Sequence, residues 1–94
     1  MTVADTMRRK LELAFSPAEL VVEDDSAKHA GHSGARPGGE THFSVRLVSE
    51  SFAGVSRVER QRRVYATLAD LMKADGIHAL SLTTLTPAEV WQEH

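Results

Sequence analysis

The chain has 94 residues, 41% of them hydrophobic and 26% charged, and a formal net charge of −2 at pH 7. This length suits a single domain spanning residues 1–94 with one small core, and the composition is typical of a folded globular protein. Cysteine is absent, which excludes disulfides and favours the cytoplasm or an organelle matrix over secretion. We expect no membrane insertion, because no apolar run approaches the roughly 18 residues of a membrane span.

Apolar residues at helical spacing predict a first helix over residues 3–15. Thr2 and Asp5 have the spacing of a capping box, and Pro17 should end the helix because proline disfavours a helical residue before it. A first strand is expected at about residues 19–23.

A long loop follows, over residues 26–41, with four glycines, one proline and no large apolar side chain. We expect it to be flexible, and a loop of this length in a compact domain is often functional, so it is the first place to look for a site. After it, residues 42–49 alternate apolar and polar side chains and predict a second strand whose odd positions face the core.

The longest predicted helix begins with Ser56 and Glu59 as a capping box and ends at Gly76. A third strand is expected over residues 79–85, and Pro87 is suited to the first position of a last short helix. The element order is therefore α-β-β-α-β-α. The apolar stripe of the long helix is predicted to consist of Val58, Val64, Tyr65, Leu68, Leu71 and Met72.

Histidine is the most chemically versatile residue type in the chain, and imidazole is a common metal ligand. By position, His42 is expected to be a solvated strand residue, His78 to lie at the edge of the core, and His94 to be terminal. Spacing alone leaves the two loop histidines open between exposed polar residues and ligands. Without cysteine a private zinc site is disfavoured, whereas histidines can replace two cysteines on one iron of an iron-sulfur cluster. The five copies are His29, His32, His42, His78 and His94.

A second candidate surface is the arginine cluster at the start of the long helix. Arg57, Arg60 and Arg63 are expected on one side of the helix and Arg62 on the other. Glu59 has i,i+4 spacing to Arg63, which predicts a salt-bridged surface, although such a cluster also suits phosphates or an acidic partner. The sequence shows no nucleophile placed with a base and no phosphate-binding glycine loop, so we expect no enzyme.

Several strings, in order and over nearly the whole chain, resemble the BolA-like family. They are Asp24-Asp25-Ser26 with His29, Glu40-Thr41-His42-Phe43, Phe52-Ala53-Gly54-Val55-Ser56-Arg57, Arg60-Gln61-Arg62-Arg63-Val64-Tyr65, His78-Ala79-Leu80 and Thr86-Pro87.

This resemblance implies an α+β fold like the class II KH domain, with a three-stranded mixed sheet and helices packed on one face. It also implies a partner, a monothiol glutaredoxin, which forms a heterodimer around a 2Fe-2S cluster shared with glutathione. His78 matches the family's C-terminal histidine ligand. His29 matches the loop ligand when counted from Ser26, and His32 lies closer when counted back from His42.

The leading hypothesis is therefore a non-enzymatic adaptor in iron-sulfur cluster assembly, trafficking or iron sensing, in which the isolated chain holds no cluster. A monomer or weak homo-oligomer is expected for the free protein. The alternative is a DNA-binding transcriptional regulator that uses the four arginines, Arg57, Arg60, Arg62 and Arg63. A third hypothesis is a zinc-dependent or pH-responsive histidine module.

Overall fold

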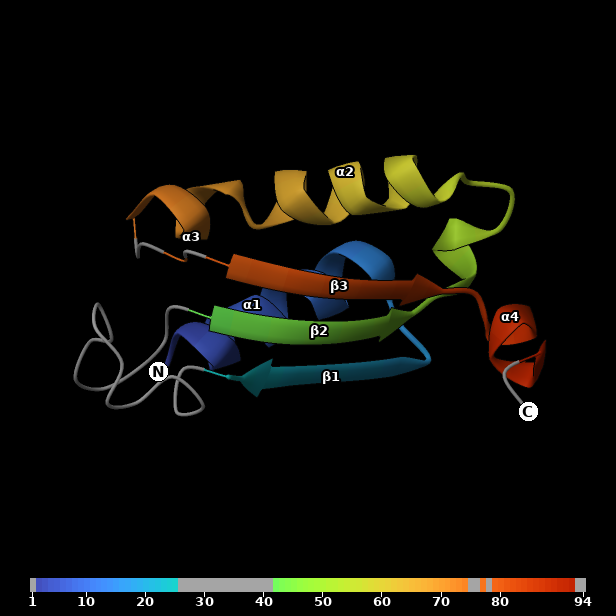
Figure 1. Cartoon of the computed structure of the whole chain (residues 1–94), viewed down its shortest axis with the longest axis horizontal. Helices are drawn as coiled ribbons and strands as arrows, with labels where there is room; N and C mark the ends of the chain where they lie inside the picture. The colour runs from blue at the N-terminus through green and yellow to red at the C-terminus, as the bar shows by residue number, and fades with distance from the viewer. Residues whose placement is uncertain (1, 26–41, 75–76, 78, 93–94) are drawn as a thin grey trace.

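The computed structural model describes residues 2–25, 42–74, 77 and 79–92. Its elements follow the expected α-β-β-α-β-α order, with a short 3-10 helix added after the second strand and the long helix divided in two (Figure 1). The segment expected to be a flexible loop, residues 26–41, lies outside the described residues. The elements are α1 (Val3–Phe15), β1 (Glu19–Asp24), β2 (His42–Val48), the 3-10 helix (Glu50–Phe52), α2 (Arg57–Thr67), α3 (Ala69–Ala74), β3 (Ala79–Leu85) and α4 (Pro87–Gln92).

The three strands form one mixed sheet, as expected, and their order in it is β1-β2-β3. β1 is antiparallel to β2, with Val22 opposite Val45, whereas β2 and β3 run parallel, with Phe43 opposite Leu80. One end of the sheet therefore holds the end of β1 and the beginnings of β2 and β3.

The predicted cap of α1 is confirmed. The Thr2 hydroxyl accepts from the Asp5 amide, and the Asp5 carboxylate accepts from the Thr2 amide. The helix ends at Phe15, and Ser16 adopts a left-handed conformation with φ of 44°. This cap and the following proline explain why the helix boundary could be located from sequence.

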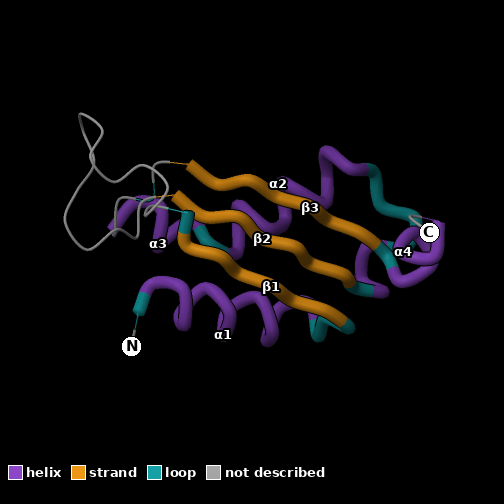
Figure 2. Tube along the Cα trace, turned by 60° about the horizontal axis from the view of Figure 1, so that its bottom comes forward, coloured by secondary structure: helices purple, strands orange, loops and turns teal. Residues whose placement is uncertain are grey.

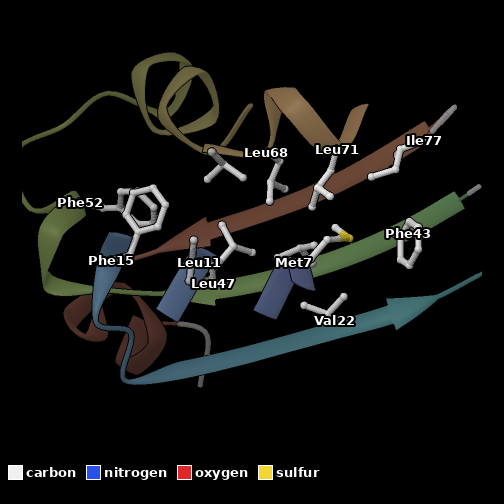
Figure 3. Packing of buried hydrophobic residues seen from close by; sticks show 12 residues of the cluster. Met7, Leu11, Phe15, Val22, Phe43, Leu47, Phe52, Leu68, Leu71 and Ile77 are labelled. Atoms are coloured by element: carbon white, nitrogen blue, oxygen red, sulfur yellow. The ribbon is translucent and has the colours of Figure 1, made fainter. Parts of the chain in front are cut away.

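The helices α1, α2 and α3 cover one face of the sheet and enclose the core (Figure 2). Figure 3 shows Phe43 and Ile77 toward one end of this core and the Phe15 and Phe52 rings beside each other toward the other. Those two rings lie 5.2 Å apart, centroid to centroid. The buried cluster is Met7, Leu11, Phe15, Val22, Phe43, Val45, Leu47, Phe52, Val64, Leu68, Leu71 and Ile77.

The prediction of one continuous helix up to Gly76 was wrong, because the helix breaks at Leu68. Leu68 has φ −101° and ψ 7°, and α3 begins at the next residue. Just before the break, the Thr67 hydroxyl donates to the Arg63 carbonyl at 2.8 Å, a local bond of a kind that bends helices.

The predicted stripe was also too broad. Val64, Leu68 and Leu71 are buried, but Val58 is 62% and Tyr65 37% exposed. Both residues thus lie away from the core.

Helical side chains bond to both outer edges of the sheet. Arg8 of α1 donates to the Val22 carbonyl of β1 at 3.2 Å. Arg60 of α2 donates to the Thr84 carbonyl of β3 at 3.1 Å. Because unpaired strand edges can recruit other strands, these contacts restrict such pairing.

Candidate functional site

Three parts of the chain meet at the end of the sheet where β2 and β3 begin. The amide of Asp25 donates to the carbonyl of His42 at 2.7 Å, which extends the β1–β2 ladder by one pair. His42 in turn lies opposite Ala79, the first residue of β3. The chain between Asp25 and His42 carries His29 and His32, and His78 directly precedes Ala79. All three predicted ligands lie outside the described residues, but their described neighbours share this end of the sheet.

The neighbours of His78 are well anchored. Ile77 is 5% exposed and Phe43 2% exposed, and both belong to the core. Leu80 packs partly against the same core, and its carbonyl accepts from the Tyr65 hydroxyl at 3.3 Å. The chain on both sides of His78 is therefore fixed to the rigid part of the fold.

His42 occupies the opposite face of the sheet from the core. Along β2, Phe43 and Val45 are buried, whereas His42, Ser44 and Arg46 are half-buried on the other face, as expected for the outward side of this strand. On that face the Ser44 hydroxyl donates to the Asp25 carboxylate. This contact joins the residue before segment 26–41 to the strand that follows it, and no sequence pattern pointed to it.

Histidine, aspartate and glutamate side chains do not gather into a ready metal site in the part of the chain that the structure describes: no group of three or more is close enough to hold an ion. Any metal-bearing site at this end of the sheet therefore needs donors from residues 26–41 or 78, or from a partner.

The four predicted surface arginines separate into two kinds. Arg60 is 5% exposed, so its assignment to a binding surface was wrong. Its guanidinium donates to Glu89 at 2.6 and 3.1 Å, to the Val55 carbonyl at 2.8 Å and to the Thr84 carbonyl at 3.1 Å. It also lies 5.7 Å from the centre of the Phe52 ring. The Arg60 guanidinium is thus engaged in contacts within the fold and is not available on the surface.

The contact with Arg60 lowers the pKa of Glu89. Hydrogen bonds from the Arg60 guanidinium and from the Thr86 amide lower the pKa of Glu89 to about 2. The Thr86 hydroxyl also accepts from the Glu89 amide, which completes a capping box at the start of α4. One sequence signal could have revealed this role, since Arg60 lies four residues before Val64 and shares its core-facing side.

The remaining arginines are on the surface. Arg62 and Arg63 both lie near the Glu59 carboxylate, at 3.8 and 3.4 Å, so the predicted Glu59–Arg63 pair is present. Arg57 is exposed and has no ion pair with any residue that the structure describes. The basic surface is therefore smaller than expected and partly neutralised.

Two exposed features were not predicted as sites. A hollow of about 290 Å³ lies over the sheet face that the helices leave open, and Ser44, Arg46 and Ser81 are among its lining residues. Trp91 of α4 is 82% exposed. Arg46 in the hollow is paired with Glu19 at 3.0 Å, which satisfies its charge locally.

The chain is similar in sequence to a known protein family and to proteins from other organisms. Residues 11–89 match the family model described as BolA-like protein. The chain is 50% identical over 88 residues to SufE-like protein 1, chloroplastic/mitochondrial, and 47% identical over 88 residues to Protein BOLA1, chloroplastic, both from Arabidopsis thaliana. The matches cover 89% and 92% of this chain but 24% and 54% of those proteins, so the chain corresponds to only part of each.

A bacterial relative and a solved structure extend the comparison. The DNA-binding transcriptional regulator BolA of Escherichia coli is 38% identical over 92 residues, covering 98% of this chain and 82% of that protein. The structure of BolA1 from Arabidopsis thaliana superposes with a TM-score of 0.83 at 44% identity, covering 95% of this chain and 96% of the other. As for membranes, every helix within the described ranges is too short or too polar to span a bilayer. The cytoplasmic location stays a prediction.

Proposed function

Since the chain belongs to the BolA-like protein family, we propose that it is a non-enzymatic adaptor in iron-sulfur cluster handling. In this role it binds a monothiol glutaredoxin and contributes histidine nitrogens to a 2Fe-2S cluster shared with the glutaredoxin and glutathione. The cluster is cargo held between two proteins.

The donor chemistry of the chain fits this role. It has no cysteine, so it cannot supply the four thiolates of an ordinary cluster. Histidines can serve two positions on one iron, and such a pair requires a partner to hold the other iron. A chain restricted to histidine donors is thus suited to half of a shared site.

The observation that carries the proposal is the convergence at one end of the sheet. The hydrogen bond from the Asp25 amide to the His42 carbonyl brings together the two ends of the segment that bears His29 and His32. The pairing of His42 with Ala79 places that same point beside the residue that follows His78. The fold therefore supports a two-histidine donor set from sequence positions that lie about 50 residues apart.

The anchoring of this end of the sheet supports the same role. Ile77 on one side of the predicted ligand is buried and β3 on the other side is a regular strand, and anchored neighbours reduce the freedom that a ligand has to lose on binding. The name of the relative SufE-like protein 1 is consistent with a place in iron-sulfur pathways. We accordingly assign His78 as one donor and one of His29 or His32 as the second.

The test is a titration of the chain into a monothiol glutaredoxin that carries a reconstituted cluster, followed by visible absorption and circular dichroism. The wild-type chain should change the cluster spectrum, and His78→Ala should abolish that change. His29→Ala and His32→Ala, made separately, should identify the second donor.

His42→Ala is the matched control, because His42 lies beside Ala79 on the face of β2 that points away from the core. It should behave like the wild type. An unchanged spectrum with wild-type protein, or an equal change with His78→Ala, rejects the proposal.

A second candidate function is DNA binding, which is favoured by the name of the Escherichia coli relative. The available surface here is Arg57, Arg62 and Arg63 at the start of α2, without Arg60. Glu59 neutralises part of it, and the net charge of −2 gives little general attraction to phosphates. The adaptor role is therefore the better supported of the two.

A further inference from the structure

The hollow on the open face of the sheet has the chemistry of a second binding site. The helices α1, α2 and α3 cover the opposite face (Figure 2), and side chains from all three strands line this hollow of about 290 Å³. We propose that it binds a lysine side chain in a basic segment of a partner protein. The inference is independent of the proposed function, because it uses none of the predicted histidine ligands.

The strand register arranges the lining side chains in two rows across the sheet. The rows are Glu23, Ser44 and Ser81, and Val21, Arg46 and Thr83. Neighbouring strands lie about 4.8 Å apart, so the backbones at Glu23 and Ser81 are separated by roughly 10 Å. The short side chain of Ser44 lies between them, which leaves the space above the sheet open.

Glu23 supplies the charge of the hollow. Its side chain is exposed, and its carboxylate has no hydrogen bond or ion pair with any residue in the described part of the chain. Arg46, in the neighbouring row, is instead paired with Glu19 at 3.0 Å. With Asp25, the described residues of this face carry three carboxylates and one guanidinium, so the face attracts a cation.

Val21 makes the hollow suitable for a cation on an aliphatic stem. It is 42% exposed and lies two residues from Glu23 on the same face of β1. This separation is about 7 Å along the strand, comparable with the four-carbon stem of lysine. The stem can therefore pack on Val21 while the ammonium group reaches Glu23. The exposed hydroxyls of Ser81 and Thr83 can accept its other N–H groups, directly or through water.

The size of the hollow favours one side chain over a free small molecule. Sites for drug-sized ligands have about 300–1,000 Å³ and enclose most of the ligand surface. This hollow has about 290 Å³ and lies on an uncovered sheet face. A lysine held by the backbone of a partner does not need such enclosure, because the partner's own fold keeps it in place.

The test is a titration of the isotope-labelled full chain with the peptide Gly-Ser-Lys-Ser-Lys-Ser-Gly at low salt, followed by NMR. The amide signals of Val21, Glu23, Ser81 and Thr83 should shift. Glu23→Gln should weaken binding up to about fivefold, as expected for an exposed ion pair. Ser81→Lys should abolish binding, because it places an ammonium group in the hollow and leaves Glu23 intact.

Two controls separate this site from general charge attraction. The same peptide with acetyl-lysine keeps the stem but loses the charge, so it should cause no shifts. Glu50→Gln removes one exposed carboxylate of the 3-10 helix, outside the hollow, and should bind the lysine peptide like the wild type. The inference is rejected if the wild type shows no shifts, if the shifts lie elsewhere, if acetyl-lysine acts equally, or if Glu23→Gln and Glu50→Gln have equal effects.

A second copy of the chain is the alternative occupant, and analytical ultracentrifugation distinguishes it. Wild type and Glu23→Gln should have the same association state over a range of protein concentrations. A wild-type dimer that Glu23→Gln dissociates would make the hollow a self-association surface and would overturn the proposal.

Discussion

Arg60 and Glu89 join α2 to α4 through two charge-assisted hydrogen bonds of 2.6 and 3.1 Å. The same guanidinium bonds to the carbonyls of Val55 and Thr84, so one side chain connects the loop before α2, the end of β3 and the last helix. α4 has no buried residue of its own within its described span. The position of α4 against the rest of the fold therefore depends strongly on Arg60.

Replacing Arg60 by alanine should lower the free energy of unfolding by about 3 kcal/mol, since it breaks a partly buried ion pair and leaves the carbonyls of Val55 and Thr84 without this donor. Urea unfolding followed by far-ultraviolet circular dichroism measures the loss. Arg57→Ala, three residues earlier on the same helix but exposed, should stay within about 0.5 kcal/mol of the wild type. Equal effects of the two substitutions would contradict the structural role of Arg60.

Glu89 should make stability depend on pH in the acid range. Its pKa is about 2 in the folded chain and 4.5 when unperturbed. A folded-state pKa below the unfolded value gives stability that is fully present above pH 4.5 and is lost as the pH falls through that range toward 2.

The comparison of wild type with Glu89→Gln isolates this contribution. The wild type should be the more stable above pH 4.5, and its advantage should shrink as the pH approaches 2. Urea unfolding at a series of pH values gives both curves. The lowered pKa values of Asp5 and Asp70 act equally in both proteins and cancel in the difference. An advantage that stays constant down to pH 2 would contradict the assignment.

Most of the fold could be predicted because its signals are local. The cap of α1 by Thr2 and Asp5 and the alternation along β2 each depend on neighbours a few residues apart. The break at Leu68 escaped prediction because the apolar spacing continues through it. The Thr67 hydroxyl just before the break bonds to the Arg63 carbonyl, and sequence spacing does not reveal which rotamer forms such a bond.

The candidate site could be predicted only in part, because it is made by long-range pairing. The convergence of Asp25, His42 and Ala79 depends on the register of three strands, which residue spacing does not determine. Arg60 was assigned to the surface because arginine is usually exposed. The acceptor that makes its burial tolerable, Glu89, lies 29 residues away in another helix.

Gly54, the one glycine within the described ranges, should be sensitive to substitution, because it has a φ of +73°. A Cβ at this position would meet no atom within 4 Å, so the cost of substitution is confined to the backbone. Gly54→Ala should therefore lower the free energy of unfolding by about 1 kcal/mol.

The matched variant is Gly54→Asn, which should lose less, because asparagine tolerates the left-handed region better than alanine. Thermal and urea unfolding compare the three proteins. If alanine and asparagine proved equal at this position, the loss would come from something other than the backbone conformation.

DNA binding by this chain, if it occurs through α2, should be weak and should have a shallow salt dependence. The exposed arginines Arg57, Arg62 and Arg63 allow at most three phosphate contacts, so the logarithm of the binding constant should fall with the logarithm of salt concentration with a slope no steeper than about −3. Fluorescence anisotropy with a labelled duplex measures this slope.

Replacing the three arginines by alanine should remove the binding, while the fold, held by Arg60, should persist. Binding that survives the triple substitution would place a DNA surface elsewhere, and binding with no salt dependence would exclude the phosphate contacts on which this candidate depends.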